Sequence, residues 1–219
     1  MIKNIIFDFD GVLVDSEVLV ARSLSIYLAE RNIEFKEKEF SKLAGKKTTQ
    51  IISELSSLFN IKDEQSFFND IMLIAENLYV DKLQPVSGVE NFLKKTNFRN
   101  LIGSNNIKNR IIDGLKKIKL KNYFPDDSIF SFDLVGRSKP EPDIHLKAIK
   151  DLEINRNETI IIEDSAIGIQ AGVAAGIKVI GLTAGGHWHE GRSNKELFDA
   201  GAYDVVKNYQ DMLLLINKL

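Results

Sequence analysis

The chain of 219 residues contains no cysteine, which excludes disulfides and cysteine-ligated zinc or iron–sulfur centres. It also lacks an excess of charge of either sign, because 29 Lys and Arg residues stand against 31 Asp and Glu residues. Nucleic-acid-binding proteins need a basic excess to neutralise phosphates, so we expect no nucleic-acid partner. The hydrophobic content of 44% is too high for a disordered chain.

Long hydrophobic runs are absent as well. The uninterrupted apolar stretches are short, as in Ile160-Ile161-Ile162, whereas a membrane-spanning helix needs about 20 apolar residues. The amino-terminal segment reaches an acidic residue at Asp8, too early for a signal peptide. We therefore expect a cytoplasmic protein without a membrane partner, and the length allows one large domain or two small ones.

Six short apolar segments have the pattern of buried parallel strands. They are residues 4–9, 100–103, 128–132, 159–162, 178–182 and 204–206. Amphipathic helical patterns lie between several of them, at residues 107–118, 143–152 and 167–175. This alternation predicts an α/β fold with a Rossmann-like parallel sheet that is covered by helices on both faces.

One part of the chain breaks the alternation. Between residues 16 and 84 only helical patterns occur, at residues 18–30, 37–43, 49–59 and 64–80. A crossover between parallel strands needs far fewer residues, so we interpret this segment as an inserted helical subdomain. The predicted organisation is a core domain of residues 1–15 and 85–219 with a helical cap of residues 16–84. A single domain with one long helical excursion is the alternative.

The first predicted strand ends in acidic residues, in the sequence Asp8-Phe9-Asp10-Gly11. Ligands of open parallel sheets bind beyond the carboxyl ends of the strands. Asp8 and Asp10 are two residues apart, so they project similarly from an extended backbone and repel one another. A hard cation such as magnesium relieves that repulsion. A solvated turn is the alternative interpretation, since Asp and Gly are common in turns.

Polar groups follow three further strands. Ser104 could cap a helix or hold an anion together with helix amides. Lys139 lies in a proline-containing loop, where a lysine is ordinarily solvated but could instead balance the aspartates and bind a phosphoryl oxygen. Glu163 and Asp164 follow a strongly apolar strand, where carboxylates need a partner or a metal, although Asp164 or Ser165 could also cap a helix. We expect these groups to converge at one edge of the sheet.

These four motifs and the helical insert resemble the haloacid dehalogenase superfamily of phosphohydrolases over essentially the whole chain. The helical insert resembles the cap of its subfamily of phosphoglycolate phosphatases, β-phosphoglucomutases and sugar-phosphate phosphatases. The resemblance implies the fold of that superfamily, with Asp8 as the nucleophile and Asp10 as the general acid/base. It also implies a magnesium ion held by Asp8, the Asp10 backbone carbonyl and Asp164, with Glu163 beside it.

By the same resemblance, Ser104 and Lys139 hold the transferring phosphoryl group. The helical insert resembles a cap that closes over the site, excludes water and selects the substrate. The residues expected to bind substrate are Gly11, Glu17, Gly45, Lys46, Lys47, Ser104, Asn105 and Lys139.

The resemblance favours a phosphatase over a mutase. The mutases carry a Lys and an Arg on either side of a cap-loop Gly and a His on the first cap helix, where this chain has Ala44, Thr48 and Val20. We expect a monomeric, magnesium-dependent phosphatase that forms an aspartyl phosphate. Its expected partner is a small phosphorylated metabolite, a sugar phosphate or sugar-acid phosphate such as 6-phosphogluconate or phosphoglycolate. A β-phosphoglucomutase-type mutase and a catalytically silent binding module are the alternatives.

A loop rich in aromatic rings follows the fifth predicted strand and contains His187, Trp188 and His189. Two histidines beside a tryptophan could indicate a metal site or a stacking site, but a third metal ligand is missing from this loop. We therefore expect the loop to pack at the mouth of the site.

Overall fold

The computed structural model describes residues 1–34, 48–189 and 191–219, which form two compact units. The first unit, here called the sheet unit, comprises Met1–Asp15, Gln84–Gly185 and Ser193–Leu219. The second, the helical unit, comprises Ser16–Leu83 and Gly186–Arg192. The helix predicted at residues 37–43 lies outside the described residues.

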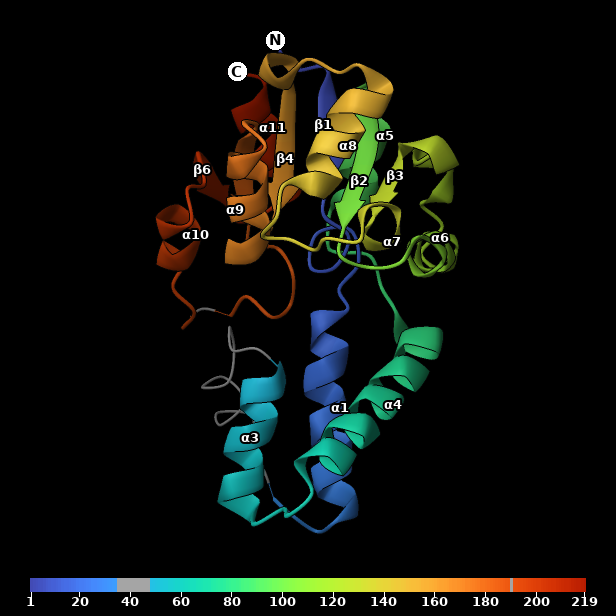
Figure 1. Ribbon diagram of the computed structural model, residues 1–219, viewed down its shortest axis with the longest axis vertical. Helices are drawn as coiled ribbons and strands as arrows, with labels where there is room; N and C mark the ends of the chain where they lie inside the picture. Colours follow the sequence, from blue (N-terminus) through green and yellow to red (C-terminus); the bar gives the residue numbers. More distant parts are fainter. Residues whose placement is uncertain (35–47, 190) are drawn as a thin grey trace. The chain divides into compact units, whose positions relative to one another are not determined.

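A six-stranded parallel sheet in the order β3-β2-β1-β4-β5-β6 forms the centre of the sheet unit (Figure 1) and confirms the predicted α/β fold. Its strands are β1 Asn4–Phe7, β2 Arg99–Ser104, β3 Ile129–Ser131, β4 Thr159–Glu163, β5 Lys178–Leu182 and β6 Asp204–Val206. Ile5 of β1 pairs with Asn100 on one side and Ile160 on the other. The first strand of the chain therefore lies in the interior of the sheet, with all four of its residues buried.

Helices cover both faces of the sheet because successive side chains of a strand point to opposite faces. The Phe7 ring contacts Phe92 of α5 at 6.2 Å, and the Phe92 ring lies 5.2 Å from Tyr209 of α11. On the other face, the ring of His145 from α8 and the side chain of Ile6 both lie close to Gly103 of β2. These helices, with α9 beside α8, are α5 Val89–Lys95, α8 Asp143–Leu152, α9 Ala166–Ala174 and α11 Tyr209–Ile216.

Three further helices lie toward the edges of the sheet, with α6 and α7 near β3 and α10 near β6 (Figure 1). They are α6 Lys108–Lys117, α7 Phe132–Val135 and α10 Lys195–Asp199. The first turn of α6 has no side-chain cap of its own, and the Lys108 amide instead donates to a carboxylate oxygen of Asp133 on α7 at 3.1 Å. This contact joins two elements that follow neighbouring strands.

The segment between β1 and α5 leaves and re-enters the sheet unit at one place, here called the neck. The Asp15 amide donates to the Gln84 carbonyl at 2.9 Å, and the Val86 amide donates to the Leu13 carbonyl at 3.0 Å. The two ends of residues 16–83 are therefore held side by side by backbone hydrogen bonds.

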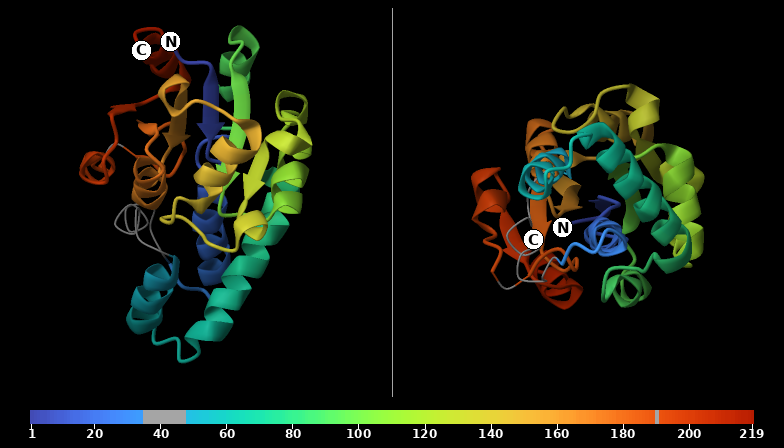
Figure 2. Two further views of the ribbon diagram at one scale, coloured as in Figure 1. Left: turned by 45° about the horizontal axis from the view of Figure 1, so that its top comes forward. Right: turned by 90° about the horizontal axis from the view of Figure 1, so that it is seen from below.

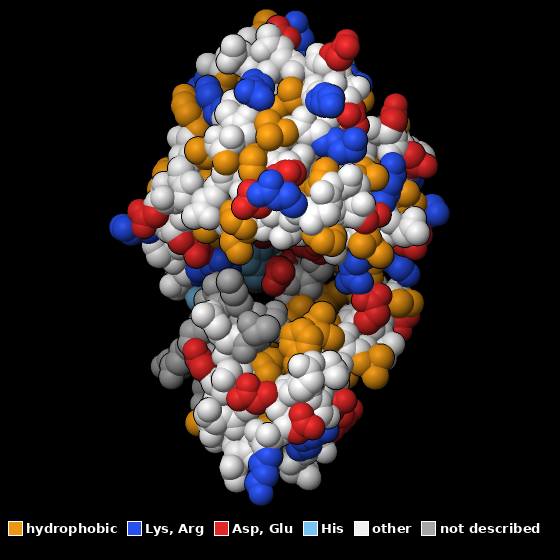
Figure 3. Space-filling view, viewed as in Figure 1, with side chains coloured by type: hydrophobic (Ala, Val, Ile, Leu, Met, Phe, Trp, Pro, Cys, Tyr) orange, Lys and Arg blue, Asp and Glu red, His pale blue; other side chains and the backbone are white. Residues whose placement is uncertain are grey.

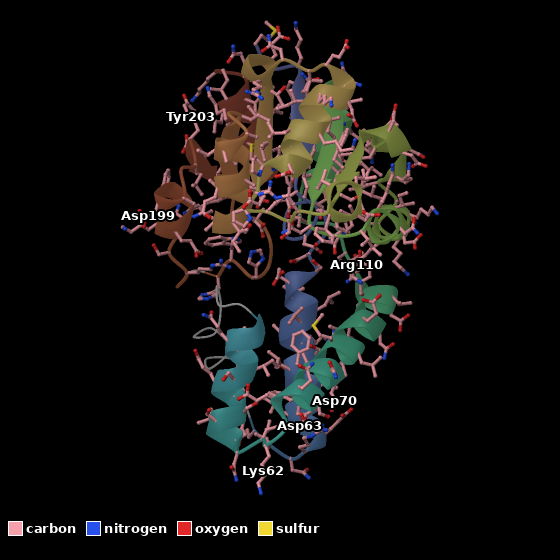
Figure 4. All side chains as sticks on the ribbon, in the orientation of Figure 1. Lys62, Asp63, Asp70, Arg110, Asp199 and Tyr203 are labelled. Carbon is pink, nitrogen blue, oxygen red and sulfur yellow. The ribbon has the colours of Figure 1, made fainter. Side chains whose placement is uncertain are left out.

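The helical unit has a core of its own. It contains α1 Glu17–Glu30, α3 Thr48–Phe59 and α4 Glu64–Lys82. Tyr27 and Phe67 stack with ring centroids 4.6 Å apart inside a cluster of buried apolar residues. Asp63, labelled in Figure 4, begins α4 by accepting a hydrogen bond from the Ser66 amide at 2.9 Å.

The two ends of the chain lie close together on the sheet unit (Figure 1 and Figure 2). On the face shown in Figure 3, basic and acidic side chains are interspersed over the sheet unit, as the small net charge predicts. Among the described residues, no helix combines the length and the apolar character that crossing a membrane requires.

Candidate active site

The loop after β1 presents two carboxylates at the carboxyl end of the strand. The Asp8 amide donates to the Ile162 carbonyl at 2.9 Å, which continues the pairing with β4 by one residue. The chain then turns sharply, because Gly11 adopts a φ of 70°, a left-handed conformation that favours glycine. The Gly11 amide donates to the Val14 carbonyl at 2.7 Å within this turn. The structure therefore gives Gly11 a conformational role, whereas its predicted role in binding substrate stays a prediction.

Lys139 lies between two carboxylates from different strands. Its Nζ donates to Asp8 Oδ1 and to Glu163 Oε1, each at 2.6 Å. The Lys139 side chain is only 4% exposed and that of Glu163 only 1%, so the interpretation of Lys139 as a solvated loop lysine is wrong. Adjacent carboxylates must have a counter-charge when they are buried, and this ammonium provides it.

The charges around this ion pair shift two pKa values. Burial is the largest cause, and the Glu163 carboxylate the second, of an Asp8 pKa that is raised well above its usual range. The Lys139 ammonium opposes this shift. Burial alone would lower the pKa of Lys139, but the Asp8 and Glu163 carboxylates outweigh burial and raise that pKa above its usual value. At neutral pH the lysine is therefore charged.

Both oxygens of Glu163 are occupied. Oε1 accepts from Lys139, while Oε2 accepts from the Asp164 amide at 2.9 Å and from the Ser165 amide and hydroxyl at 3.0 Å each. Ser165 also caps α9, because its Oγ accepts from the Gly168 amide at 3.1 Å. The start of α9 thus fixes the carboxylate that holds Lys139.

Replacing Gly168 with alanine is expected to destabilise the protein by about 3 kcal/mol, because buried overpacking forces neighbouring groups apart. A Cβ at this position would lie 1.6 Å from Glu163 Oε1, so the carboxylate would have to leave Lys139. Chemical denaturation measures the change, and the exposed Gln170→Ala on the same helix is the matched control. Unchanged stability in Gly168→Ala would contradict this packing.

The end of β2 connects the remaining groups. Ser104 Oγ accepts from the Asn106 amide at 3.1 Å, and Asn105 Oδ1 accepts from the Lys139 backbone amide at 2.7 Å. The Asn106 side-chain amide donates to Asp10 Oδ2. Because α6 begins only at Lys108, Ser104 is not the cap of that helix, and that interpretation is wrong. The end of β2 thus links two sets of contacts into one cluster, Asn106 joining the Ser104 hydroxyl to Asp10 and Asn105 holding the loop of Lys139.

Three carboxylates of this cluster could hold a cation. Ligand oxygens of Asp8, Glu163 and Asp164 lie within 4.8 Å of one another. Carboxylate oxygens are the ligands that magnesium prefers, so the donor set fits this metal. Lys139 contacts only Oδ1 of Asp8, whereas both oxygens of Glu163 already accept hydrogen bonds. Asp8 and Asp164 are thus the side chains best placed to contact a metal.

Several residues predicted to bind substrate belong to the helical unit or fall outside the described residues. Gly45, Lys46 and Lys47 fall in the segment that the structure does not describe. Glu17 is the first residue of α1 and belongs to the helical unit. The loop with His187 and Trp188 also belongs to the helical unit, and there the Arg192 guanidinium stacks over the Trp188 ring at 3.7 Å. The substrate contacts of Glu17, Gly45, Lys46 and Lys47 stay predictions, and so does the packing of this loop at the mouth of the site.

Two residues of the cluster were missing from the predicted site. Asn106 lies two residues after Ser104, so its position at a strand end was a usable signal, but nothing in the sequence indicates that it reaches Asp10. Ser165 has the position of a helix cap, and its second hydrogen bond to Glu163 depends on packing.

The sequence is similar to a known family and to known phosphatases. A family model described as haloacid dehalogenase-like hydrolase matches residues 5–182. The chain is 28% identical over 192 residues to the 6-phosphogluconate phosphatase of Escherichia coli (strain K12), with 85% of each chain covered. It is 26% identical over 210 residues to the phosphorylated carbohydrates phosphatase of Thermotoga maritima, with 94% of each chain covered.

A solved structure is similar over the whole chain. It is a conserved haloacid dehalogenase-like protein of unknown function from Agrobacterium tumefaciens, with 31% identity, a TM-score of 0.87 and coverage of 100% of this chain and 99% of that one. The family model spans all of the residues that carry the carboxylate–lysine cluster, including Asp8 and Glu163. The protein therefore belongs to the haloacid dehalogenase-like hydrolase family, and its relatives place it among the phosphatases of that family.

Proposed function

We propose that this enzyme is a magnesium-dependent phosphatase that hydrolyses a small phosphorylated metabolite through an aspartyl phosphate. The observation that carries the proposal is the buried Lys139 ammonium, 2.6 Å from Asp8 Oδ1 at the carboxyl end of the central strands. A carboxylate attacks a phosphoryl group only when nearby positive charge offsets their mutual repulsion. When bound, magnesium supplies further charge of that kind and orients the phosphoryl oxygens.

The proposed chemistry divides hydrolysis into two displacements. An oxygen of Asp8 attacks phosphorus, the phosphorus–oxygen bond to the alcohol breaks, and Asp10 donates a proton to the departing oxygen. Asp10 then takes a proton from water as that water attacks the aspartyl phosphate, which releases inorganic phosphate and restores Asp8. Ser104 accepts a hydrogen bond from Asn106 and so keeps its own hydroxyl hydrogen to donate to a phosphoryl oxygen, beside Lys139.

The proposed substrate class is sugar phosphates and sugar-acid phosphates. Two relatives over most of the chain are named as a 6-phosphogluconate phosphatase and as a phosphorylated carbohydrates phosphatase, which supports this class. We assign substrate selection to the helical unit acting as a cap, with Glu17, Gly45, Lys46 and Lys47 as the candidate residues.

A panel of phosphorylated metabolites tests the proposal by released inorganic phosphate. We expect turnover of at least one sugar phosphate or sugar-acid phosphate with magnesium, loss of turnover with a chelator, and recovery when magnesium is restored. The Asp8→Asn variant controls for contaminating phosphatases. Absence of release from every member of the panel, or conversion of β-glucose 1-phosphate to glucose 6-phosphate in place of release, would overturn the proposal.

A further inference from the structure

The side chain of Asn106 holds a carboxylate that the proposed reaction needs to move protons. Its amide nitrogen donates to Asp10 Oδ2, across 96 residues of sequence. A carboxyl group that is held through one oxygen has a restricted rotation about its own axis, and its second oxygen then points in a defined direction. The contact therefore orients Asp10 without adding a charge beside it.

Asn106 is itself held in place from two sides. Its backbone amide donates to Ser104 Oγ at 3.1 Å, and its carbonyl accepts from the Phe132 amide of α7 at 3.1 Å. The side chain is half-buried. A donor that is fixed by its own backbone contacts loses little conformational entropy when it orients another group.

The preceding asparagine makes a different contact. Asn105 Oδ1 accepts from the backbone amide of Lys139 at 2.7 Å and so fixes the loop that carries the ammonium. Two consecutive residues of the same type thus support two different parts of the site. Asn105 supports the group that contacts the phosphoryl oxygens, and Asn106 supports the group that contacts the departing oxygen.

We propose that Asn106 is a positioning residue that aims Asp10 at the departing oxygen of the substrate. The inference rests on the proposed function, because it assumes that Asp10 protonates the leaving group. It has a specific consequence. A strongly basic leaving group needs that proton in the transition state, whereas an acidic leaving group departs without it. The effect of Asn106 must therefore grow with the basicity of the leaving group.

Three esters of similar shape provide the test: p-nitrophenyl, phenyl and benzyl phosphate, in order of increasing basicity of the leaving group. We measure kcat/KM for each with magnesium, since this ratio reports the step in which the leaving group departs. General acid catalysis contributes about 10²–10⁴-fold, so misaiming Asp10 in Asn106→Ala is expected to cost about 10-fold with benzyl phosphate and under about 2-fold with p-nitrophenyl phosphate.

Matched variants separate positioning from general damage. Asn105→Ala is expected to lower kcat/KM by a similar factor with all three esters, because it loosens the phosphoryl-binding loop. In an Asp10→Asn background, Asn106→Ala is expected to add no further loss, since the group that it aims is gone. Asn106→Ser, which is smaller and polar, is the second variant if Asn106→Ala does not fold, and its expected pattern is the same.

The outcomes are distinguishable. If the unmodified enzyme hydrolyses none of the three esters or the metabolites with magnesium, the proposed function fails and this inference fails with it. If the unmodified enzyme is active but Asn106→Ala loses the same factor with every ester, or loses nothing, only the positioning role is overturned. A further loss from Asn106→Ala in the Asp10→Asn background overturns it as well.

Discussion

Replacing Lys139 with methionine is expected to inactivate the enzyme and also to destabilise the sheet unit. The substitution keeps the apolar length of the side chain but removes the ammonium that lies 2.6 Å from both Asp8 and Glu163. Removing one partner of a buried ion pair destabilises a protein by about 3–5 kcal/mol, because the other charge stays buried without a partner. Loss of one group that stabilises transition-state charge lowers kcat by about 10³-fold.

Chemical denaturation with a chelator present, together with a phosphate-release assay, measures both effects. In the folded protein the pKa of Lys139 is raised, so its stabilising contribution is present throughout neutral pH and is lost only as the pH rises through the folded-state value. The deficit of Lys139→Met is expected to shrink toward acidic pH, where Asp8 takes up a proton. Lys147→Met on α8, where the side chain is partly exposed and pairs with Asp151, is the control, since a surface pair contributes about 1 kcal/mol at most. Equal stability of the two variants at pH 7 would contradict the buried counter-charge.

Replacing Asp8 with asparagine is expected to abolish turnover while making the protein more stable. The variant lacks the proposed nucleophile but leaves Lys139 paired with Glu163. Because burial and the Glu163 carboxylate raise the pKa of Asp8 above its unfolded value, the ionised form is disfavoured in the folded state. At pH 7 the variant is therefore expected to unfold at a higher denaturant concentration than the unmodified protein.

The pH dependence of the stability gained by Asp8→Asn tests whether the gain comes from the raised pKa of Asp8. A raised folded-state pKa means that the folded protein binds more protons than the unfolded chain between the two pKa values, so stability falls as the pH rises through that interval. Asp8→Asn lacks this fall. The difference in unfolding free energy between the two proteins is therefore expected to grow from about pH 4 upward, the usual pKa of an aspartate. The chelator is essential, because a bound cation stabilises the ionised form. A variant that is less stable than the unmodified protein at every pH would refute this account.

The position of the acidic groups could be predicted from sequence because each follows an uninterrupted apolar strand. Asp8 follows β1 and Glu163 ends β4, and parallel neighbouring strands bring their carboxyl ends to one edge. The strand predicted at residues 4–9 ends earlier, at Phe7, because the amides of Leu13 and Val14 both donate to the Phe9 carbonyl and turn the chain. Periodicity does not detect such a turn.

The contacts of Lys139 and Asn106 could not be predicted from the residues alone. Lys139 follows α7 and an irregular loop, so no strand pattern indicates that its side chain is buried. The partner of Asn106 is 96 residues away, and Gly168 is needed only because the Glu163 carboxylate packs against α9. Such contacts depend on the packing of segments from different parts of the chain, whereas sequence periodicity reports only local burial.

The neck described above allows the sheet unit and the inserted segment to change independently of one another. Backbone hydrogen bonds at Asp15 and Val86 hold the two ends of residues 16–83 together. The sheet unit therefore constrains only where this segment leaves and where it returns. Each doubling of the length of such a closed segment costs about 0.6 kcal/mol of closure entropy. Segments of very different size and sequence can therefore be exchanged at this junction during evolution. The carboxylate–lysine cluster on the sheet can thus stay the same while the helical unit, to which we assign substrate selection in the proposed function, changes.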